Sequence, residues 1–273
     1  LVVTATYRDA MKSLTLLRTV TVPFLIITAT APPSIQPILL DFFATSSARL
    51  HATTTVRPEI SYAISPKHVS PADLGTTLQA HLQQHLPLLS SSGQGLVFCN
   101  SRADTLFLAD HVPNSVVHHS GMDEDDRSAS IQAFRNGRTR VLITTSGLSA
   151  GVNFDCVEMV VHAGTPHSLI DFAQESGRAG RRAQMSFSHI LRTGLKSVPS
   201  EDTLGIMELN KWITAGEGCR RAALGVYLDG IEGQTCDSFT PNNPCDRCAI
   251  GPQPGQATSL SPWRHMLPKG KTP

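Results

Sequence analysis

Short apolar runs alternate with amphipathic stretches through the first two thirds of the chain. The runs are rich in Val, Ile and Leu and are bounded by turn residues, which is typical of buried strands. We predict strands at residues 24–28, 95–99, 115–118, 140–144, 158–162 and 185–190. Apolar spacing of three and four predicts helices near residues 34–43, 72–89, 103–111, 124–136 and 168–174. This alternation predicts an α/β fold, a parallel sheet with helices on both faces.

The loops that follow the strands are the expected ligand-binding positions, because parallel sheets bind ligands at the carboxyl ends of their strands. These loops begin after Cys99, His118, Thr144 and His162. The segment 57–71 is weakly patterned and holds three prolines, so we expect a hinge between two lobes there. Beyond Thr203 the pattern changes to two helical stretches and a cysteine-bearing loop.

Composition narrows the class of protein. Hydrophobic residues make up 40% of the 273 positions, which is enough to form a core. No apolar run is long enough to suggest a membrane span, and no leader pattern is visible, so we expect an intracellular protein. The net charge of +1 argues neither for nor against nucleic acid. The six cysteines then point to a metal rather than to disulfides.

Several segments carry motifs that occur together, in this order, in one family. They are T-A-T-A at residues 28–31, R-P-E-I at 57–60, V-F-C-N-S-R at 97–102, H-H-S-G-M at 118–122, T-T-S-G-L-S-A-G-V-N at 144–153 and Q-E-S-G-R-A-G-R at 174–181. Together they resemble the motifs of RecQ-like ATP-dependent DNA helicases of superfamily 2. The segment at 144–153 resembles the family's motif V. The last segment, at 174–181, resembles motif VI and differs from the family's Q-E-T-G-R-A-G-R by one conservative residue. The resemblance covers nearly all of residues 7 to 250.

The resemblance implies a RecA-like lobe of the P-loop NTPase type that works on nucleotide and DNA. Arg181 would be the arginine finger and Arg178 its partner, because a planar guanidinium suits the charge that develops on a transferred phosphoryl group. Gln174, Gly151 and Asn153 would contact ATP, which is bound with Mg. The family's DNA contacts would fall on Asn100, Ser101, Arg102, His119, Thr144 and Thr145. The alternative is that these side chains have no ligand and are only exposed to solvent or stabilise their loops.

A second site is predicted from the cysteines. Cys219, Cys236, Cys245 and Cys248 follow the spacing C-x16-C-x8-C-x2-C, and the first begins a C-R-R run, as in the RecQ zinc subdomain. Relative to that family, six additional residues stand between the second and third cysteines. Four thiolates close a tetrahedral zinc site of the structural kind. The alternative is four unrelated cysteines, and Cys99 and Cys156 are most simply small buried hydrophobes.

Two other segments imitate motifs without meeting their requirements. The acidic run at residues 123–126 has no apolar strand before it and is better explained as the start of a helix. The G-K-T at residues 270–272 lacks the first glycine of a phosphate loop. A RecQ motor needs both motifs on its first lobe, so we expect that lobe upstream and no ATPase activity from this chain alone. Residues 154–158 also lack the basic residues that the family has after motif V.

The predicted organisation has four parts: a remnant of the first lobe at residues 1–56, the second RecA-like lobe at 57–195, a small helical zinc-binding subdomain at 196–250, and a disordered tail at 251–273. The predicted function is a 3′-to-5′ DNA helicase of RecQ type, nuclear, acting on single-stranded or 3′-tailed DNA in repair and recombination. Two alternatives stay open. One is a non-catalytic degenerate fragment that at most binds nucleic acid, and the other is a DEAD-box-like RNA helicase.

Overall fold

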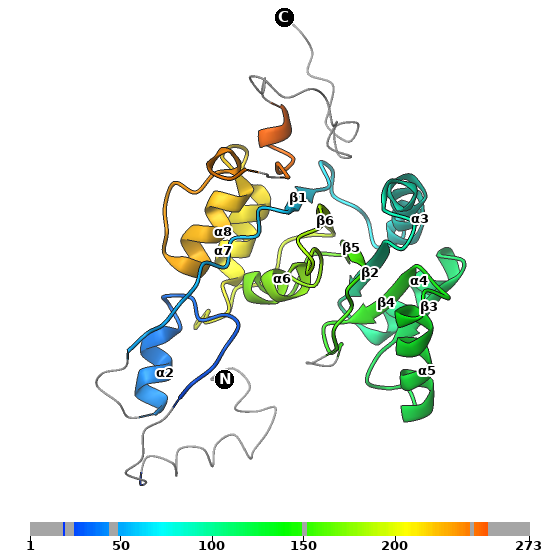
Figure 1. Ribbon diagram of the computed structural model, residues 1–273, viewed down its shortest axis with the longest axis horizontal. Helices are drawn as coiled ribbons and strands as arrows, with labels where there is room; N and C mark the ends of the chain where they lie inside the picture. The colour runs from blue at the N-terminus through cyan, green and yellow to red at the C-terminus, as the bar shows by residue number, and fades with distance from the viewer. Residues whose placement is uncertain (1–18, 20–24, 44–48, 149–151, 241–242, 251–273) are drawn as a thin grey trace, which may run out of the picture.

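A six-stranded parallel sheet forms the centre of the molecule in the computed structural model, which describes residues 19, 25–43, 49–148, 152–240 and 243–250 (Figure 1). In spatial order the strands are β1 (Ile60–Ile64), β6 (Ser186–Leu191), β5 (Val157–Ala163), β2 (Gln94–Cys99), β4 (Val141–Thr145) and β3 (Ser115–His118). All neighbouring pairs are parallel. The carboxyl ends of the strands therefore meet along one edge, as the sequence predicts.

Helices cover both faces of the sheet. The described residues contain α2 (Gln36–Phe42), α3 (Leu74–His85), η3 (Leu86–Leu88), α4 (Arg102–His111), α5 (Glu124–Arg135), α6 (Leu169–Ser176), α7 (Ile206–Thr214) and α8 (Arg220–Asp229), with η4 (Cys236–Ser238) and η5 (Cys248–Ile250) following. Helices α3 and α4 pack on one face of the sheet, and α5 and α6 pack on the other. On that second face α7 contacts α6, and α8 contacts α7. The RecA-like α/β architecture predicted from the sequence is confirmed.

Strands β1, β2 and β6 are buried at every residue and β4 and β5 at all but one, whereas β3 is mostly half-buried. Successive residues of β2, such as Leu96 and Val97, belong to the two different cores and are fully buried. Phe134 of α5 and Phe172 of α6 fill the α5–α6 face and are also fully buried. None of the described helices is both long and apolar enough to cross a membrane.

One predicted strand is wrong, and one strand was not predicted. The run at 24–28 is no strand over Leu25–Thr28, where Leu25 and Ile27 are 83% and 84% exposed and have no neighbouring strand to pair with among the described residues; residue 24 lies outside them. The segment 57–71 instead contains β1, whose five residues are all buried. Its I-S-Y-A-I sequence lacks the continuous run of large apolar residues that marks a buried strand, and prolines stand on both sides of it.

The cysteine-bearing segment covers the outer edge of β1 (Figure 1). Asn243 donates its backbone N–H to the Pro58 carbonyl at 2.8 Å, and Asp246 donates to the Tyr62 carbonyl at 2.9 Å. The Ser61 hydroxyl donates to the Pro244 carbonyl at 2.6 Å. An exposed edge strand would leave these groups open to other chains, so this segment closes that side of the sheet.

Candidate functional site

The loop that follows α6 carries the two arginines singled out from the sequence. Ser168 caps the helix by accepting the Asp171 N–H at 3.0 Å, and Gly177 ends it. Gly180 then adopts a left-handed φ of +68° and approaches Glu59 so closely that an added Cβ would lie 2.9 Å from the Glu59 Cγ. Gly180 is therefore required by the backbone path of this arginine-bearing loop, residues 177–181.

Arg178 is half-buried and held by backbone. Its two terminal nitrogens donate to the Leu148 carbonyl at 3.2 Å and the Val152 carbonyl at 3.4 Å. Burial, followed by the charge of Arg181, lowers the pKa of Arg178 from its ordinary value. The carbonyls belong to the two residues that flank 149–151, so Arg178 joins motif VI to motif V. Gly151, a predicted ATP contact, lies outside the described residues.

Arg181 is exposed and reaches the other predicted nucleotide contact in motif V. It donates to the Asn153 side-chain oxygen, and the Asn153 amide donates to Asp155 at 2.7 Å. Arg182 pairs with the same Asp155 carboxylate at 2.6 Å. The structure thus brings Arg181 and Asn153 together, as expected of residues that would share one ligand.

Two further contacts tie motif VI to upstream motifs. The Gln174 amide donates to the Thr30 hydroxyl at 2.8 Å, linking the predicted ATP contact to the T-A-T-A segment. Arg57 donates to the Gly177 carbonyl at 3.2 Å and to the Ala179 carbonyl at 2.9 Å. The sequence marks Arg57 only as part of R-P-E-I, and its contact with the arginine-bearing loop was not predicted.

The predicted nucleic-acid contacts lie on the carboxyl edge of β2, β3 and β4. Arg102 is exposed and donates to the Ser120 hydroxyl at 2.9 Å, so the V-F-C-N-S-R and H-H-S-G-M loops meet. Ser101 is the N-cap of α4 and accepts the Asp104 N–H at 3.1 Å. His119 accepts the Gly121 N–H at 3.1 Å. Ser101 and His119 therefore also hold the backbone of the loops that present Arg102.

The two threonines at the end of β4 differ in exposure. Thr144 is fully buried, and its hydroxyl donates to the Thr145 carbonyl at 3.0 Å. Thr145 is only half-buried. Alternation along a strand explains the difference, because neighbouring side chains point to opposite sides. Of the two hydroxyls, the one nearer the surface is that of Thr145.

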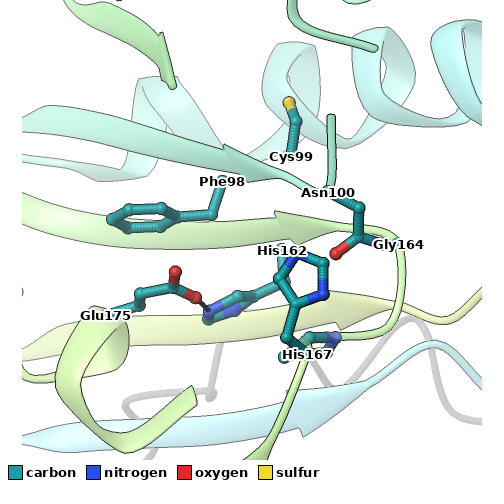
Figure 2. A pocket seen from close by; sticks show the side chains of 8 residues that line it. Phe98, Cys99, Asn100, His162, Gly164, His167 and Glu175 are labelled. Carbon is teal, nitrogen blue, oxygen red and sulfur yellow. Dashed lines mark hydrogen bonds and ion pairs between the residues drawn. The ribbon is translucent and has the colours of Figure 1, made fainter. Parts of the chain in front are cut away.

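A small polar hollow lies between β2, β5 and α6 (Figure 2). Nε2 of the buried His162 ring is hydrogen-bonded to the Glu175 carboxylate at 2.9 Å, and Figure 2 marks this contact with a dashed line. His162 Nδ1 is buried and has no protein partner. The hollow has a volume of about 10 Å³, which is close to the space that one water molecule needs. On its other side Asn100, a predicted DNA contact, donates to the Thr165 carbonyl at 3.1 Å.

The cysteine cluster consists of Cys219, Cys236, Cys245 and Cys248, whose four sulfurs all lie within 4.8 Å of one another. A tetrahedral zinc with Zn–S bonds of ~2.3 Å separates its sulfurs by ~3.8 Å, so the donor set fits a structural zinc. Contact with Cys236 and Cys245 lowers the pKa of the Cys219 thiol, whereas contact with Cys219 raises that of Cys236. Burial raises the pKa of Cys248 to about 12. Such crowded thiols need a cation before all four can ionise together.

Two buried arginines hold the cluster against the lobe. Arg221, 1% exposed, donates to the Cys236 sulfur and to the Pro58, Ile60 and Asn243 carbonyls. Arg220 pairs with Asp246 at 2.6 Å. The additional residues between Cys236 and Cys245, of which 241–242 lie outside the described residues, leave the four sulfurs together. The C-R-R pattern signals these arginines, but their partners were not predictable from it.

Comparisons with known proteins agree with this geometry. Residues 77–183 match the model of the helicase conserved C-terminal domain. An ATP-dependent DNA helicase RecQ of Pasteurella multocida is 27% identical over 58% of this chain and 24% of its own length. The ATP-dependent DNA helicase Q-like 2 of Arabidopsis thaliana is 24% identical over 89% of this chain and 35% of its own. A mimivirus protein provisionally named an ATP-dependent RNA helicase is 21% identical over 89% of this chain and 45% of its own.

Among solved structures, Saccharomyces cerevisiae Dbp5 bound to RNA and ADP BeF3 superposes with a TM-score of 0.53 over 70% of this chain and 49% of that one, at 18% identity. That likeness concerns the fold. The chain spans less than half the length of each curated relative named above. The match of residues 77–183 to the family model, together with the parallel sheet and the order of the motifs, makes this part of the chain similar to the C-terminal lobe of superfamily 2 helicases.

Proposed function

We propose that this chain supplies the second motor lobe and the zinc-binding subdomain of a RecQ-like ATP-dependent DNA helicase that unwinds DNA with 3′-to-5′ polarity in repair and recombination in the nucleus. A first lobe would hold Mg-ATP. Arg181 and Arg178 would then face the γ-phosphate, where guanidinium groups stabilise the charge of the transferred phosphoryl group. The exposed Leu25 and Ile27 suit this arrangement, because such an apolar run is suited to burial against a further lobe.

The cysteine cluster is the observation that favours a RecQ-like DNA helicase over an RNA helicase. The lobe itself is shared with RNA helicases, so the sheet and the arginines do not separate the two classes. The cluster is continuous with the lobe: its segment pairs with the edge of β1, and Arg221 connects the Cys236 sulfur to the backbone at Pro58 and Ile60. A zinc held by the four thiolates would fix this segment, which has few apolar residues of its own.

Nucleic acid would cross the carboxyl edge beside Asn100, Arg102 and Thr145. Arg102 is the charged member of this group, and it is exposed. We therefore expect binding that depends on phosphate and falls steeply with salt. Removing one phosphate contact lowers the slope of log affinity against log salt by about 0.7 for single strands.

The test combines metal analysis with binding on the purified chain. We expect one zinc per chain, lost in Cys245→Ser, and tighter binding to single-stranded DNA than to RNA of the same sequence. Arg102→Ala should weaken binding equally for different sequences and lower the salt slope, whereas the exposed Arg138→Ala should change neither. Absence of zinc, or a preference for RNA, would favour the RNA-helicase alternative instead.

A further inference from the structure

The short segment Arg57–Ile60 lies between the arginine-bearing loop and the cysteine cluster and touches both. Towards the loop, Arg57 donates to the Gly177 and Ala179 carbonyls. The Gly177 carbonyl stands at the end of α6, and the Ala179 carbonyl stands in the turn that follows. Carbonyl groups at helix ends have no partners within the helix. Arg57 also pairs with Glu59, which fixes the direction of its guanidinium group.

The fork of an arginine suits this position because it can donate to two carbonyls at once. A lysine offers one compact charge and cannot span both acceptors with the same geometry. Glu59 supports the loop a second time, since its Cγ lies against Gly180. The two arginines of the loop, Arg178 and Arg181, are therefore placed by a backbone that Arg57 and Glu59 hold from outside the motif.

The other side of the segment is held by the cysteine-bearing part of the chain. Arg221 donates to the Pro58 carbonyl at 3.2 Å and to the Ile60 carbonyl at 3.0 Å. The Asn243 backbone N–H donates to the Pro58 carbonyl, and its side chain donates to the Glu59 carbonyl at 3.3 Å and the Ser186 carbonyl at 2.8 Å. Asn243 is 5% exposed, so its contacts are protected from water.

We propose that Arg57 is a positioning residue for the arginine-bearing loop, and that the cysteine-bearing segment sets the position of that loop through Asn243, Arg221 and the backbone of residues 57–60. Two hydrogen-bonded steps connect the segment to the loop: Asn243 and Arg221 hold residues 58–60, and Arg57 holds residues 177 and 179. The role given to Arg178 and Arg181 rests on the proposed function, whereas the coupling itself is a property of this chain.

The test measures amide hydrogen exchange of the loop peptide in the purified chain without nucleotide or nucleic acid. Loss of two hydrogen bonds in Arg57→Ala should speed exchange of residues 177–181 on the order of ten-fold, with exchange in β2 and β4 unchanged. Arg57→Lys should give an intermediate rate, and the exposed Arg138→Ala should leave the loop as it is. If Arg57→Ala leaves loop exchange unchanged, or speeds it equally across the sheet, Arg57 does not position the loop.

The coupling is tested with Asn243→Ala, alone and combined with Arg57→Ala. Asn243→Ala should speed loop exchange, although the hydrogen bonds of Asn243 go to residues 58, 59, 186 and 221 and not to the loop. The double variant should exchange no faster than Arg57→Ala alone, because both changes cut the same connection. Independent, multiplying effects, or no effect of Asn243→Ala, would overturn the coupling. Failure to bind DNA would instead count against the proposed function and leave these exchange results standing.

Discussion

The buried ion pair between Arg220 and Asp246 offers the sharpest test of how the cysteine-bearing segment is attached. The Arg220 Nε lies 2.6 Å from Asp246 Oδ1, and the two side chains are 7% and 8% exposed. The second Asp246 oxygen accepts the Ile64 N–H at 3.2 Å. Arg220 also donates to the Trp212 carbonyl at 3.2 Å and lies 5.3 Å above the Trp212 ring. Asp246→Ala removes the only anionic partner among these.

The expected loss of unfolding free energy is large. Removing one partner of a buried pair costs about 3–5 kcal/mol, because the other charge stays buried without compensation. The Ile64 N–H, at the end of β1, loses an acceptor as well, which adds about 1 kcal/mol. Since domains are stable by only about 5–15 kcal/mol, Asp246→Ala should lower the urea midpoint strongly. Asp246→Asn, which keeps an acceptor for Ile64, should lose less.

Urea unfolding followed by far-ultraviolet circular dichroism measures the loss, with metal content determined for each variant. The control is Asp155→Ala, which breaks an exposed pair with Arg182 of the same 2.6 Å length and should cost less than about 1 kcal/mol. In a cycle with Arg220→Met, the double variant should be more stable than the two single losses predict, by about 1–3 kcal/mol. Equal losses for Asp246→Ala and Asp155→Ala at unchanged metal content would refute the reasoning.

Three further outcomes are expected. First, burial, followed by the charges of His85, Arg220 and His162, lowers the pKa of His189 well below its ordinary value. Below about pH 6.5 the unfolded chain therefore binds a proton at this position that the folded chain does not bind. The free energy of unfolding should fall by up to about 1.4 kcal/mol per pH unit as pH drops from about 7 to 5, and His189→Leu should flatten that profile. Second, Gly180→Ala should destabilise more than Gly137→Ala, because both residues have positive φ (+68° and +70°) but only Gly180 is crowded; thermal melts of both variants would show it, and equal losses would contradict it. Third, purified 1–273 should hydrolyse no ATP with or without DNA, because its sequence holds no phosphate loop to bind Mg-ATP; turnover that Arg181→Ala abolishes would contradict this.

The sheet was predictable wherever the chain shows long apolar runs. Strands β2, β4 and β5 are buried at nearly every residue, so their largely apolar character is visible in the sequence. Strand β1 is also buried, but it is buried partly by polar partners: Ser61 bonds to Pro244, and the Ile64 N–H bonds to Asp246. Those partners are more than 180 residues away in the chain. Local pattern cannot anticipate a strand whose edge is completed by so distant a segment.

The candidate site was predictable to a similar extent. Motif resemblance located Arg178, Arg181 and Asn153, and the fold brings Arg181 and Asn153 into contact. Motif order cannot tell which hydroxyl of a pair reaches the surface, and Thr144 is fully buried. The contact of Arg57 with the arginine-bearing loop could not be predicted, for a different reason. It joins residues 120 and 122 positions apart, and only the parallel pairing of β1 with β6 brings them close.

The two arginines of the loop are held by bonds of different strength, and this bears on the proposed motor. Arg178 is half-buried, with two carbonyl partners, so moving it would leave those carbonyls without their donor. Arg181 is exposed and is held by the neutral amide of Asn153. A phosphate group carries full negative charge and can accept two parallel guanidinium bonds, whereas the neutral amide oxygen offers no opposite charge to the arginine. Nucleotide would therefore draw Arg181 away from Asn153 while Arg178 stays in place as the fixed member of the pair.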